Sequence, residues 1–253
     1  MISLNELVQY LDRLFEGFPE GEDPSNNGLQ VEGGGEIRKV VFGVDACAEL
    51  FRQASERQAD FVFVHHGLSW GGGWRRLTEI TADRMRSLLT NRISLYAVHL
   101  PLDANVQVGH NFTIARRLRL QDMEPAFDYH GCTIGCLGVF PQAEALTVFA
   151  QEIERALSTE CRIFPFGSEN VRTIGIVSGG GADAVAECAR RGVDCLVTGE
   201  VKHQDYHVMK EYRQNVIAAG HYRTETPGLY AVAELLTRKF ELDAEVVELP
   251  TGL

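Results

Sequence analysis

Two stretches of this chain follow the same order of elements, and that repeat limits the possible folds more than any other feature of the sequence. Residues 41–67 and 174–200 read VFGVDACAELFRQASERQADFVFVHHG and IGIVSGGGADAVAECARRGVDCLVTGE. Each begins with a short apolar run, continues through a turn and a helical pattern, and reaches an aspartate and a second apolar run with a polar end. Such alternation indicates an α/β fold. The repeat indicates two related halves, either by duplication or because two strand–helix–strand units resemble each other by chance.

The apolar runs have the length and composition of buried strands. They cover residues 39–45, 60–66, 93–100, 173–178, 194–200 and 215–221. Near-continuous apolar segments of this kind are typical of parallel strands that are covered on both faces. Helical patterns separate them, and Ser3 and Glu6 have the spacing of a capping box at the start of the first helix. We therefore expect mostly parallel sheets.

The length of 253 residues is enough for one large domain or two small ones. We expect a first α/β half over residues 1–120 and a second over residues 171–253. The segment 121–170 has a less regular pattern, with one strand and one helix, and is expected to form a small central α+β segment. The two halves are expected to pack together as one structural unit.

The charge balance excludes several classes of function. The chain carries 24 lysines and arginines against 35 aspartates and glutamates, a net charge of −11. A chain this acidic, with no basic run, is a poor binder of nucleic acid and of anionic membranes. No apolar stretch approaches the roughly 20 residues that span a bilayer, and the first residues lack the layout of a signal peptide. We expect a cytoplasmic protein whose six cysteines, none in a C-x-x-C pair, are free buried thiols.

Side chains that can bind metals gather at the ends of predicted strands, where ligands bind in open α/β folds. His65 and His66 close one strand, Asp103 follows the next, and His221 and Glu225 follow a strand of the second half. Imidazole and carboxylate together suit Zn, Fe, Mn or Co more than Ca. Each group also has a structural explanation: a hydrogen-bonded histidine pair at a turn, a helix N-cap for Asp103, and a first-turn acid for Glu225.

Five further residues are candidates for orienting a metal ligand or contacting a substrate: His99, Glu200, His203, Trp70 and Arg75. His99 can hold a ligand in place by a hydrogen bond. Glu200 and His203 follow a strand end and can line a cavity there. Trp70 and Arg75 lie in the glycine-rich loop after the histidine pair, where a tryptophan can stack on a base or cover the site and an arginine can hold a phosphate.

Six segments, in this order along the chain, read SNNGLQVEG, VFGVD, DFVFVHHGL, AVHLPLDA, GVDCLVTGEVKH and AAGHYRTE. They resemble the Nif-three-like dinuclear-metal family, whose members are often named GTP cyclohydrolase 1 type 2 homologues. The resemblance implies two divalent metal ions held by His65, His66, Asp103, His221 and Glu225, with the two carboxylates preferred as bridging groups. It also implies a toroidal homohexamer.

The donor chemistry and the resemblance together favour a metal-dependent hydrolase. Two cations would lower the pKa of a bridging water toward ~7 and polarise the substrate, and the resemblance points to GTP or another nucleotide or phosphoester. Two other functions fit the same residues: a non-catalytic metal carrier or sensor, and a regulatory interaction protein whose metals stabilise a ring. The chain departs from the family pattern at His110 and after Glu200.

Overall fold

The structure is a computed structural model of the chain and describes residues 1–19, 22–74 and 76–253. It divides into two compact units. The first unit comprises Met1–Leu102 and Leu229–Leu249, and the second comprises Asp103–Gly228 and Pro250–Leu253. These bounds differ from the residue ranges expected from the sequence, because residues 103–170 belong to the second unit and the last helix and strand belong to the first.

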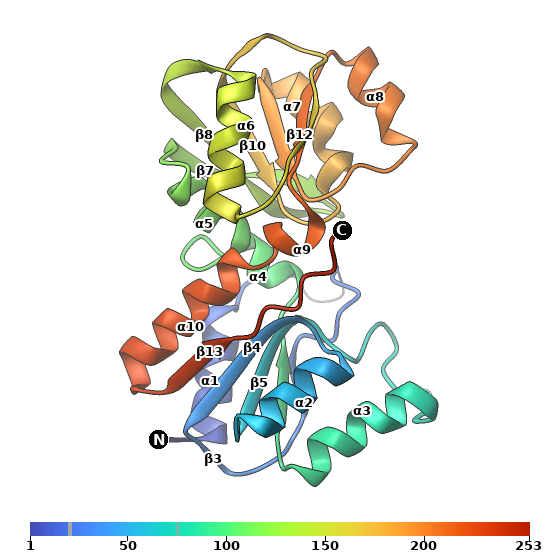
Figure 1. Ribbon diagram of the computed structural model, residues 1–253, viewed down its shortest axis with the longest axis vertical. Helices are drawn as coiled ribbons and strands as arrows, with labels where there is room; N and C mark the ends of the chain where they lie inside the picture. Colours follow the sequence, from blue (N-terminus) through green and yellow to red (C-terminus); the bar gives the residue numbers. More distant parts are fainter. Residues whose placement is uncertain (20–21, 75) are drawn as a thin grey trace. The chain divides into compact units, whose positions relative to one another are not determined.

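A five-stranded sheet forms the centre of the first unit (Figure 1). Its strands, in spatial order, are β13 (Asp243–Val246), β4 (Lys39–Asp45), β5 (Phe61–His66), β6 (Ser94–Ala97) and β2 (Gly28–Val31). The first four run parallel to one another, and β2 is antiparallel to β6. The predicted strands 39–45 and 60–66 are confirmed, and both are buried along almost their whole length.

Two helices bury their apolar residues against one face of this sheet. α2 (Ala48–Glu56) contributes Leu50 and Phe51, and α3 (Glu79–Thr90) contributes Leu88, to a core that includes valines of β4 and β5. Alternate residues of a strand point to opposite faces. The phenylalanines of β5 therefore face the other side, where Phe63 lies 6.2 Å from Phe15 between ring centroids.

The remaining elements of the first unit are helical except for one short pair of strands. α1 (Leu4–Leu14) begins at Ser3, whose hydroxyl accepts the backbone N–H of Glu6 at 3.2 Å, as the spacing predicts. Phe240 of α10 (Pro227–Phe240) packs edge-on against Tyr10 of α1, with ring centroids 5.0 Å apart. β1 (Ile2–Ser3) and β3 (Glu36–Ile37) pair antiparallel.

A six-stranded mixed sheet forms the centre of the second unit (Figure 1). Its order is β7 (Gln121–Tyr129), β8 (Cys132–Ala145), β10 (Asn170–Val177), β11 (Cys195–Thr198), β12 (Asn215–Ala218) and β9 (Arg162–Phe164). β10, β11 and β12 are parallel, whereas β7, β8 and β9 join them in antiparallel pairs. The less regular residues 121–170 thus extend the sheet of the second half at both of its edges.

Helices cover this second sheet as well. α5 (His110–Arg117) and α6 (Leu146–Leu157) share one hydrophobic core with β10, β11 and β12. The alternate strand residues Leu196 and Val216 are also fully buried, as are Cys188 of α7 (Val185–Arg191) and Met209 of α8 (Asp205–Glu211). A short 3-10 helix, Gly181–Ala184, leads into α7, and the single turn α9 (His221–Thr224) follows β12.

The aspartate of each repeat has the same structural role. Asp60 Oδ2 accepts the backbone N–H groups of Arg38 and Lys39 at 2.8 and 3.1 Å. Asp194 Oδ2 accepts those of Arg172 and Thr173 at 2.9 and 2.8 Å. In each unit the aspartate before one parallel strand therefore holds the neighbouring strand just before the two strands begin to pair, which gives the repeated sequence pattern a shared physical cause.

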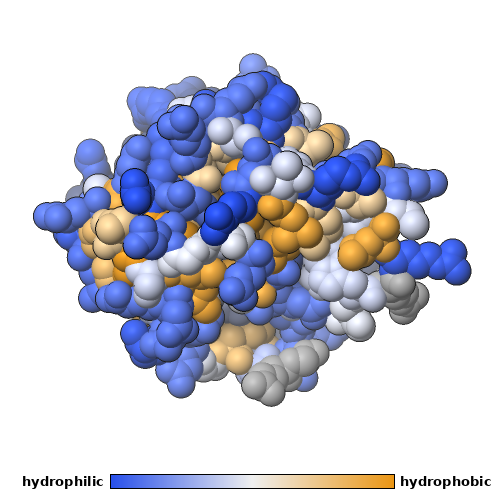
Figure 2. Space-filling model, turned by 90° about the horizontal axis from the view of Figure 1, so that it is seen from below, coloured by the Kyte–Doolittle hydropathy of each residue, from blue (hydrophilic) through white to orange (hydrophobic). Residues whose placement is uncertain are grey.

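The surface and the cysteines agree with the composition. Hydrophilic residues cover most of the face drawn in Figure 2, with hydrophobic residues exposed in small patches. No helix in the described ranges is long and apolar enough to cross a membrane. All six cysteines are free; four of them are buried, and Cys47 and Cys161 are half-buried.

Candidate metal centre

Three imidazoles lie together at the carboxyl end of the parallel strands of the first unit. His65 and His66 are the last residues of β5, and His99 follows β6 by two residues. Their ring centroids are 4.6, 5.0 and 5.5 Å apart. One ring nitrogen of each lies within 4.8 Å of a ring nitrogen of the other two. Two nitrogens bound to one zinc ion, each at about 2.0–2.1 Å, are at most about 4 Å apart, so small side-chain rotations would let this cluster share a cation.

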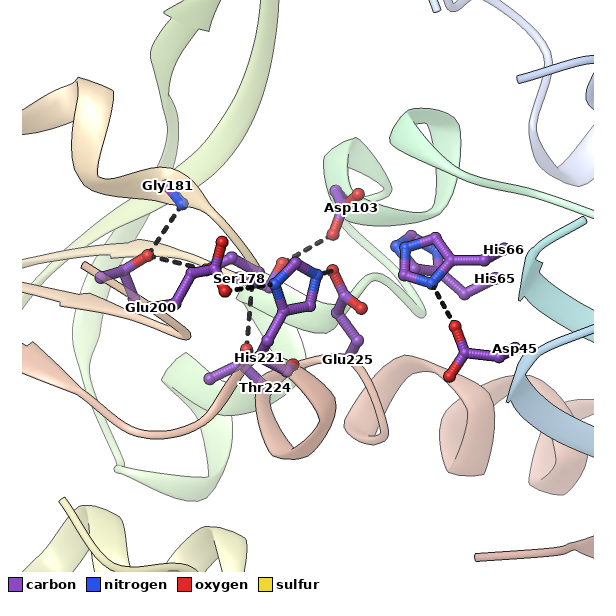
Figure 3. A network of polar contacts seen from close by, with 12 residues as sticks. Asp45, His65, His66, Asp103, Ser178, Gly181, Glu200, His221, Thr224 and Glu225 are labelled. Carbon is purple, nitrogen blue, oxygen red and sulfur yellow. Dashed lines mark hydrogen bonds and ion pairs between the residues drawn. The ribbon is translucent and has the colours of Figure 1, made fainter. Parts of the chain in front are cut away.

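Each of these imidazoles is held at Nδ1 by an oxygen acceptor. The pairs are His65 with the carbonyl of Val98 at 2.9 Å, His66 with Asp45 at 2.9 Å, and His99 with Asp23 at 2.8 Å. Figure 3 shows the second of these contacts as the dashed line from Asp45 to His66. Carbonyl and carboxylate oxygens only accept, so Nδ1 carries the proton in each ring and Nε2 carries the lone pair. Metal-binding histidines are oriented by contacts of this kind.

Asp23 keeps its negative charge although its side chain is only 4% exposed. Burial by itself raises the pKa of this carboxyl. Hydrogen bonds from His99, Asn27 and the N–H of Ser25 outweigh that effect and bring the pKa below its ordinary value. Asp23 is therefore ionised at neutral pH and serves as a permanent acceptor for His99.

The SNNGLQ segment shapes the backbone around the cluster. Gln30 Oε1 accepts the backbone N–H groups of Leu68 and Ser69 at 2.7 and 3.0 Å, just beyond the histidine pair. Asn27 Oδ1 accepts the backbone N–H of His99 at 2.8 Å. These side chains give the segment a structural function: they fix the two chain sections that carry the imidazoles.

Trp70 packs beside the imidazoles. Its indole lies edge-on to His99 with ring centroids 5.2 Å apart, and 6.1 Å from His66. The indole N–H donates to the carbonyl of Gly67 at 2.9 Å, which fixes the ring. Because 39% of Trp70 remains exposed, it both covers the cluster and leaves aromatic surface open to another ring.

In the second unit, Asp103 is buried and held from β10. It belongs to the short helix α4 (Leu100–Ala104), and Ser178 donates its hydroxyl to Asp103 Oδ1 at 2.6 Å (Figure 3). Asn111 links the same two residues, since its amide donates to the carbonyl of Asp103 and accepts the N–H of Ser178. The N-cap of the next helix is Gly109, so Asp103 is not the N-cap that its position in the sequence allowed.

His221 lies between two carboxylates at the end of β12. Its Nε2 is 3.1 Å from Glu225 Oε1, and its Nδ1 is 3.3 Å from Glu200 Oε2 (Figure 3). The hydrogen bond to Glu225, aided by the charges of Glu225 and Glu200 and opposed by burial, raises the pKa of His221 to about 9. The carboxylates therefore create a negative potential at this position, which favours a positive charge.

Gly179 and Thr224 make room for Glu225 and fix the neighbouring backbone. Gly179 has a φ of +61°, and a β-carbon on it would overlap Glu225 Oε1 and come within 3.2 Å of His221 Nε2. Its N–H donates to Thr224 Oγ1 at 3.0 Å. The turn that starts at Gly179 therefore packs closely against the carboxylate of Glu225, and a larger residue at position 179 would not leave room for it.

His110 is held in the opposite way from the histidines of the first unit. It is fully buried, and its Nδ1 accepts the backbone N–H of Gly228 at 3.0 Å. A neutral ring that accepts at Nδ1 carries its proton on Nε2. His110, one of the departures from the family pattern, therefore supports the α9–α10 connection and does not offer Nε2 as a metal ligand.

Several residues that hold the candidate ligands were not expected from the sequence: Asp23, Asp45, Ser178 and Asn111. For Asp45 a signal was present, because it ends β4 and stands opposite His66 in the parallel register. Asp23 and Ser178 lie in a loop and at a strand end more than 70 residues from the side chains they hold, and Asn111 lies in α5, eight residues after Asp103.

The other candidates have different surroundings. Glu200 contacts His221, and Trp70 contacts His99. His203 is exposed in the turn before α8, and no hydrogen bond or ion pair within the described residues joins its side chain to His221. Arg75 lies outside the described residues.

Comparison with known proteins supplies the family. A family model described as Duf34/NIF3 (NGG1p interacting factor 3) matches residues 2–251. The chain belongs to the DUF34/NIF3 family. A relative from Pyrococcus horikoshii is 42% identical over 250 residues, 98% of this chain and 99% of its own length. Another, from Deinococcus radiodurans, is 40% identical and covers 100% of this chain and 95% of its own length. Both are named GTP cyclohydrolase 1 type 2 homolog.

Solved structures agree with this DUF34/NIF3 assignment. TTHA1606 from Thermus thermophilus is 40% identical, with a TM-score of 0.91 and full coverage of both chains. The protein ybgI, titled as of unknown function, is 32% identical, with a TM-score of 0.92 and full coverage of both chains. The mixed α/β fold with its parallel central strands is therefore the fold of this family.

The donor sets of this DUF34/NIF3 chain fit divalent metal ions. The first unit offers imidazole nitrogens whose Nδ1 atoms are held by oxygen acceptors. The second offers carboxylates and an imidazole in a negative potential. Nitrogen and carboxylate donors of this kind suit borderline transition metals. The described residues thus contain His, Asp and Glu groups that can bind a metal ion.

Proposed function

We propose that this DUF34/NIF3 protein binds two divalent metal ions, Zn, Fe, Mn or Co, and hydrolyses a nucleotide or another phosphoester. The donors are His65, His66, Asp103, His221 and Glu225. The observation that carries the proposal is the imidazole cluster of the first unit, in which every ring is held at Nδ1 by an oxygen acceptor. Hydrogen bonds of this pattern fix the tautomer and orientation that metal ligation requires.

The residues around the donors keep them in place. A pair of divalent ions, when bound, supplies Lewis acidity at a phosphoryl or carbonyl oxygen and lowers the pKa of a bound water toward ~7. Ser178 fixes one carboxylate oxygen of Asp103, and Asp45 fixes the ring of His66. Partners of this kind typically contribute about 10–100-fold to metal affinity or activity.

The substrate class rests on the relatives and on Trp70. Relatives that match almost the whole chain carry the name GTP cyclohydrolase 1 type 2 homolog. Trp70 is fixed through its indole N–H beside His99 and leaves 39% of its surface exposed. Stacking of a base on an aromatic side chain is worth about 1–3 kcal/mol, so Trp70 is suited to hold the base of a nucleotide.

The family resemblance supports a further part of the proposal, assembly into a toroidal homohexamer. Such a ring has a native mass of about six times the 28.1 kDa of one chain. Mass photometry or light scattering of the purified protein measures this mass. A monomer or dimer at micromolar concentration would contradict the ring and leave the metal sites to be judged on their own.

Elemental analysis tests metal binding. We expect close to two equivalents of divalent metal per chain after purification or reconstitution, and a loss of metal in His66→Ala and Glu225→Gln. Glu211→Gln is the matched control, since Glu211 is an exposed carboxylate at the end of α8. Less than one equivalent in the reconstituted wild-type protein would contradict the proposal.

A turnover screen with the metal restored tests catalysis. GTP, other nucleotides and simple phosphoesters are the substrates, and we expect many turnovers per site. Asp103→Asn should lower the rate by at least about 100-fold while the circular dichroism spectrum is retained. If metal is bound without any turnover, and is released readily to a chelating acceptor, the protein is a metal carrier.

A further inference from the structure

A groove of about 430 Å³ lies in the second unit between the ends of α5 and α6. It is lined by Arg117, Leu118, Arg119, Glu152, Arg155 and Ala156. Arg117 ends α5 and donates to the carbonyl of Ala156 at 3.4 Å, which joins the two walls. Binding sites for small molecules commonly have volumes of about 300–1,000 Å³, so the groove is large enough for a ligand.

The charge of this groove contrasts with that of the chain. The protein has a net charge of −11, yet three arginines and one glutamate line the groove. Several other arginines, among them Arg52 and Arg191, are neutralised in ion pairs. Within the described ranges, Arg119 and Arg155 form no ion pair, and both are exposed. The groove lining therefore carries more positive than negative formal charge, although the chain as a whole is acidic.

Helix dipoles explain part of this arrangement. Arg117 and Arg155 lie in the last turns of α5 and α6, where a positive charge is favoured by the helix dipole. The dipole has no bearing on Arg119, which lies beyond the end of α5 with a φ of 59°. The helix dipoles also do not explain why arginines from both α5 and α6 line the same groove.

We propose that this groove binds a phosphorylated small molecule that also carries hydroxyl groups. Guanidinium groups match the geometry of phosphate oxygens and remain charged at all physiological pH values. Glu152 on the same wall can accept a hydrogen bond from a hydroxyl group of the ligand. A long polyanion does not fit, because the net negative charge of the rest of the chain would repel it.

The probes are inorganic pyrophosphate and ribose 5-phosphate, titrated into the purified protein by calorimetry at fixed ionic strength. Arg155→Gln should weaken binding of both by about tenfold, since a hydrogen bond to a charged group is lost. Arg119→Gly should weaken it similarly, while the melting temperature stays the same or rises, because glycine accepts the left-handed conformation. A loss of affinity without a lower melting temperature would show that Arg119 contributes to ligand binding and not to the stability of the fold.

A substitution of Glu152 tests separately whether the groove recognises the phosphate and whether it recognises the hydroxyl groups of the ligand. Glu152→Gln should strengthen pyrophosphate binding several-fold by removing a like charge, but strengthen ribose 5-phosphate binding less. The matched controls are Arg38→Gln and Glu211→Gln, which change the same charges at exposed positions that do not belong to the groove lining. Amide shifts of Leu118 and Ala156 on titration locate the site. Equal losses of affinity in Arg38→Gln and Arg155→Gln, or unchanged Leu118 and Ala156 signals, would overturn the proposal.

Discussion

At the scale of single residues, the acceptors behind the histidines determine what each ring can do. His66 and His99 are held by the carboxylates of Asp45 and Asp23, whereas His110 accepts a backbone N–H at the corresponding nitrogen. The same side chain is therefore a potential metal ligand in one place and a structural acceptor in another. The tautomer, which the hydrogen-bond partner fixes, makes the difference.

Asp45→Asn tests that role. The amide can still accept the N–H of His66 but lacks the charge that increases the basicity of the ring, so metal affinity should fall by about tenfold. Competition with a chelator of known affinity measures it. Asp83→Asn is the control, since Asp83 is an exposed residue of α3 that pairs with Arg86. Equal affinities of the two variants would show that Asp45 has no influence on the metal.

Gly179→Ala tests the close packing behind Glu225. The new methyl group would meet Glu225 Oε1 in a backbone conformation that alanine disfavours, and we expect the free energy of unfolding to fall by about 1–3 kcal/mol. Gly192→Ala isolates the backbone contribution, since Gly192 has a φ of +68° and open space around it. Urea unfolding compares the two variants. The prediction fails if Gly179→Ala costs no more than Gly192→Ala.

At the scale of elements, two parallel strand pairs, β4–β5 and β10–β11, are each held by one aspartate near the point where pairing begins, and candidate site residues lie at their carboxyl ends. Asp60 and Asp194 accept pairs of backbone N–H groups from the neighbouring strand. The bonds of Asp60 hold β4 in the register that brings Asp45 opposite His66, and the separate pairing of β5 with β6 brings Val64 opposite Ala97. His99 follows Ala97 by two residues, so strand pairing explains why it joins the histidine pair.

Asp194→Ala should therefore destabilise the second unit. Two backbone N–H groups, those of Arg172 and Thr173, lose their acceptor, and because the contact is partly exposed we expect a loss of about 1–2 kcal/mol in the free energy of unfolding. Urea unfolding followed by circular dichroism measures it. Asp183→Ala, at an exposed position, should change stability by less than about 0.5 kcal/mol. Similar values for both would contradict the proposed role.

At the scale of the whole molecule, binding of divalent metal couples to folding. The candidate donors include buried acidic groups, Asp103 and Glu225, in a chain of net charge −11. A ligand that binds only the folded state stabilises it by mass action.

Metal at about 100 times its Kd should add about 2.7 kcal/mol of stability. For a chain of this size that corresponds to a rise in melting temperature of roughly 5–10 °C. Differential scanning calorimetry, with and without EDTA, measures the shift. Glu225→Gln should show a much smaller shift. An equal shift in this variant would mean that the stabilising metal binds elsewhere.

The elements were predictable because their signals are local. The apolar runs of β4 and β5, and the Ser3 cap of α1, depend on residues within a few positions of each other. The boundaries of the units were not predictable in this way. They depend on β13 pairing with β4, a contact between segments about 200 residues apart.

The sequence by itself determined the α/β class, the alternation of the buried parallel strands with helices, and the positions of imidazole and carboxylate groups at strand ends. Tertiary structure decided which groups hold them: Asp23 behind His99, Ser178 behind Asp103, and Gly228 against His110. The physical reason is the separation along the chain over which each kind of interaction acts. Hydrophobic periodicity and capping act between near neighbours, whereas a hydrogen bond that fixes a tautomer or orients a carboxylate joins residues that only the folded chain brings together.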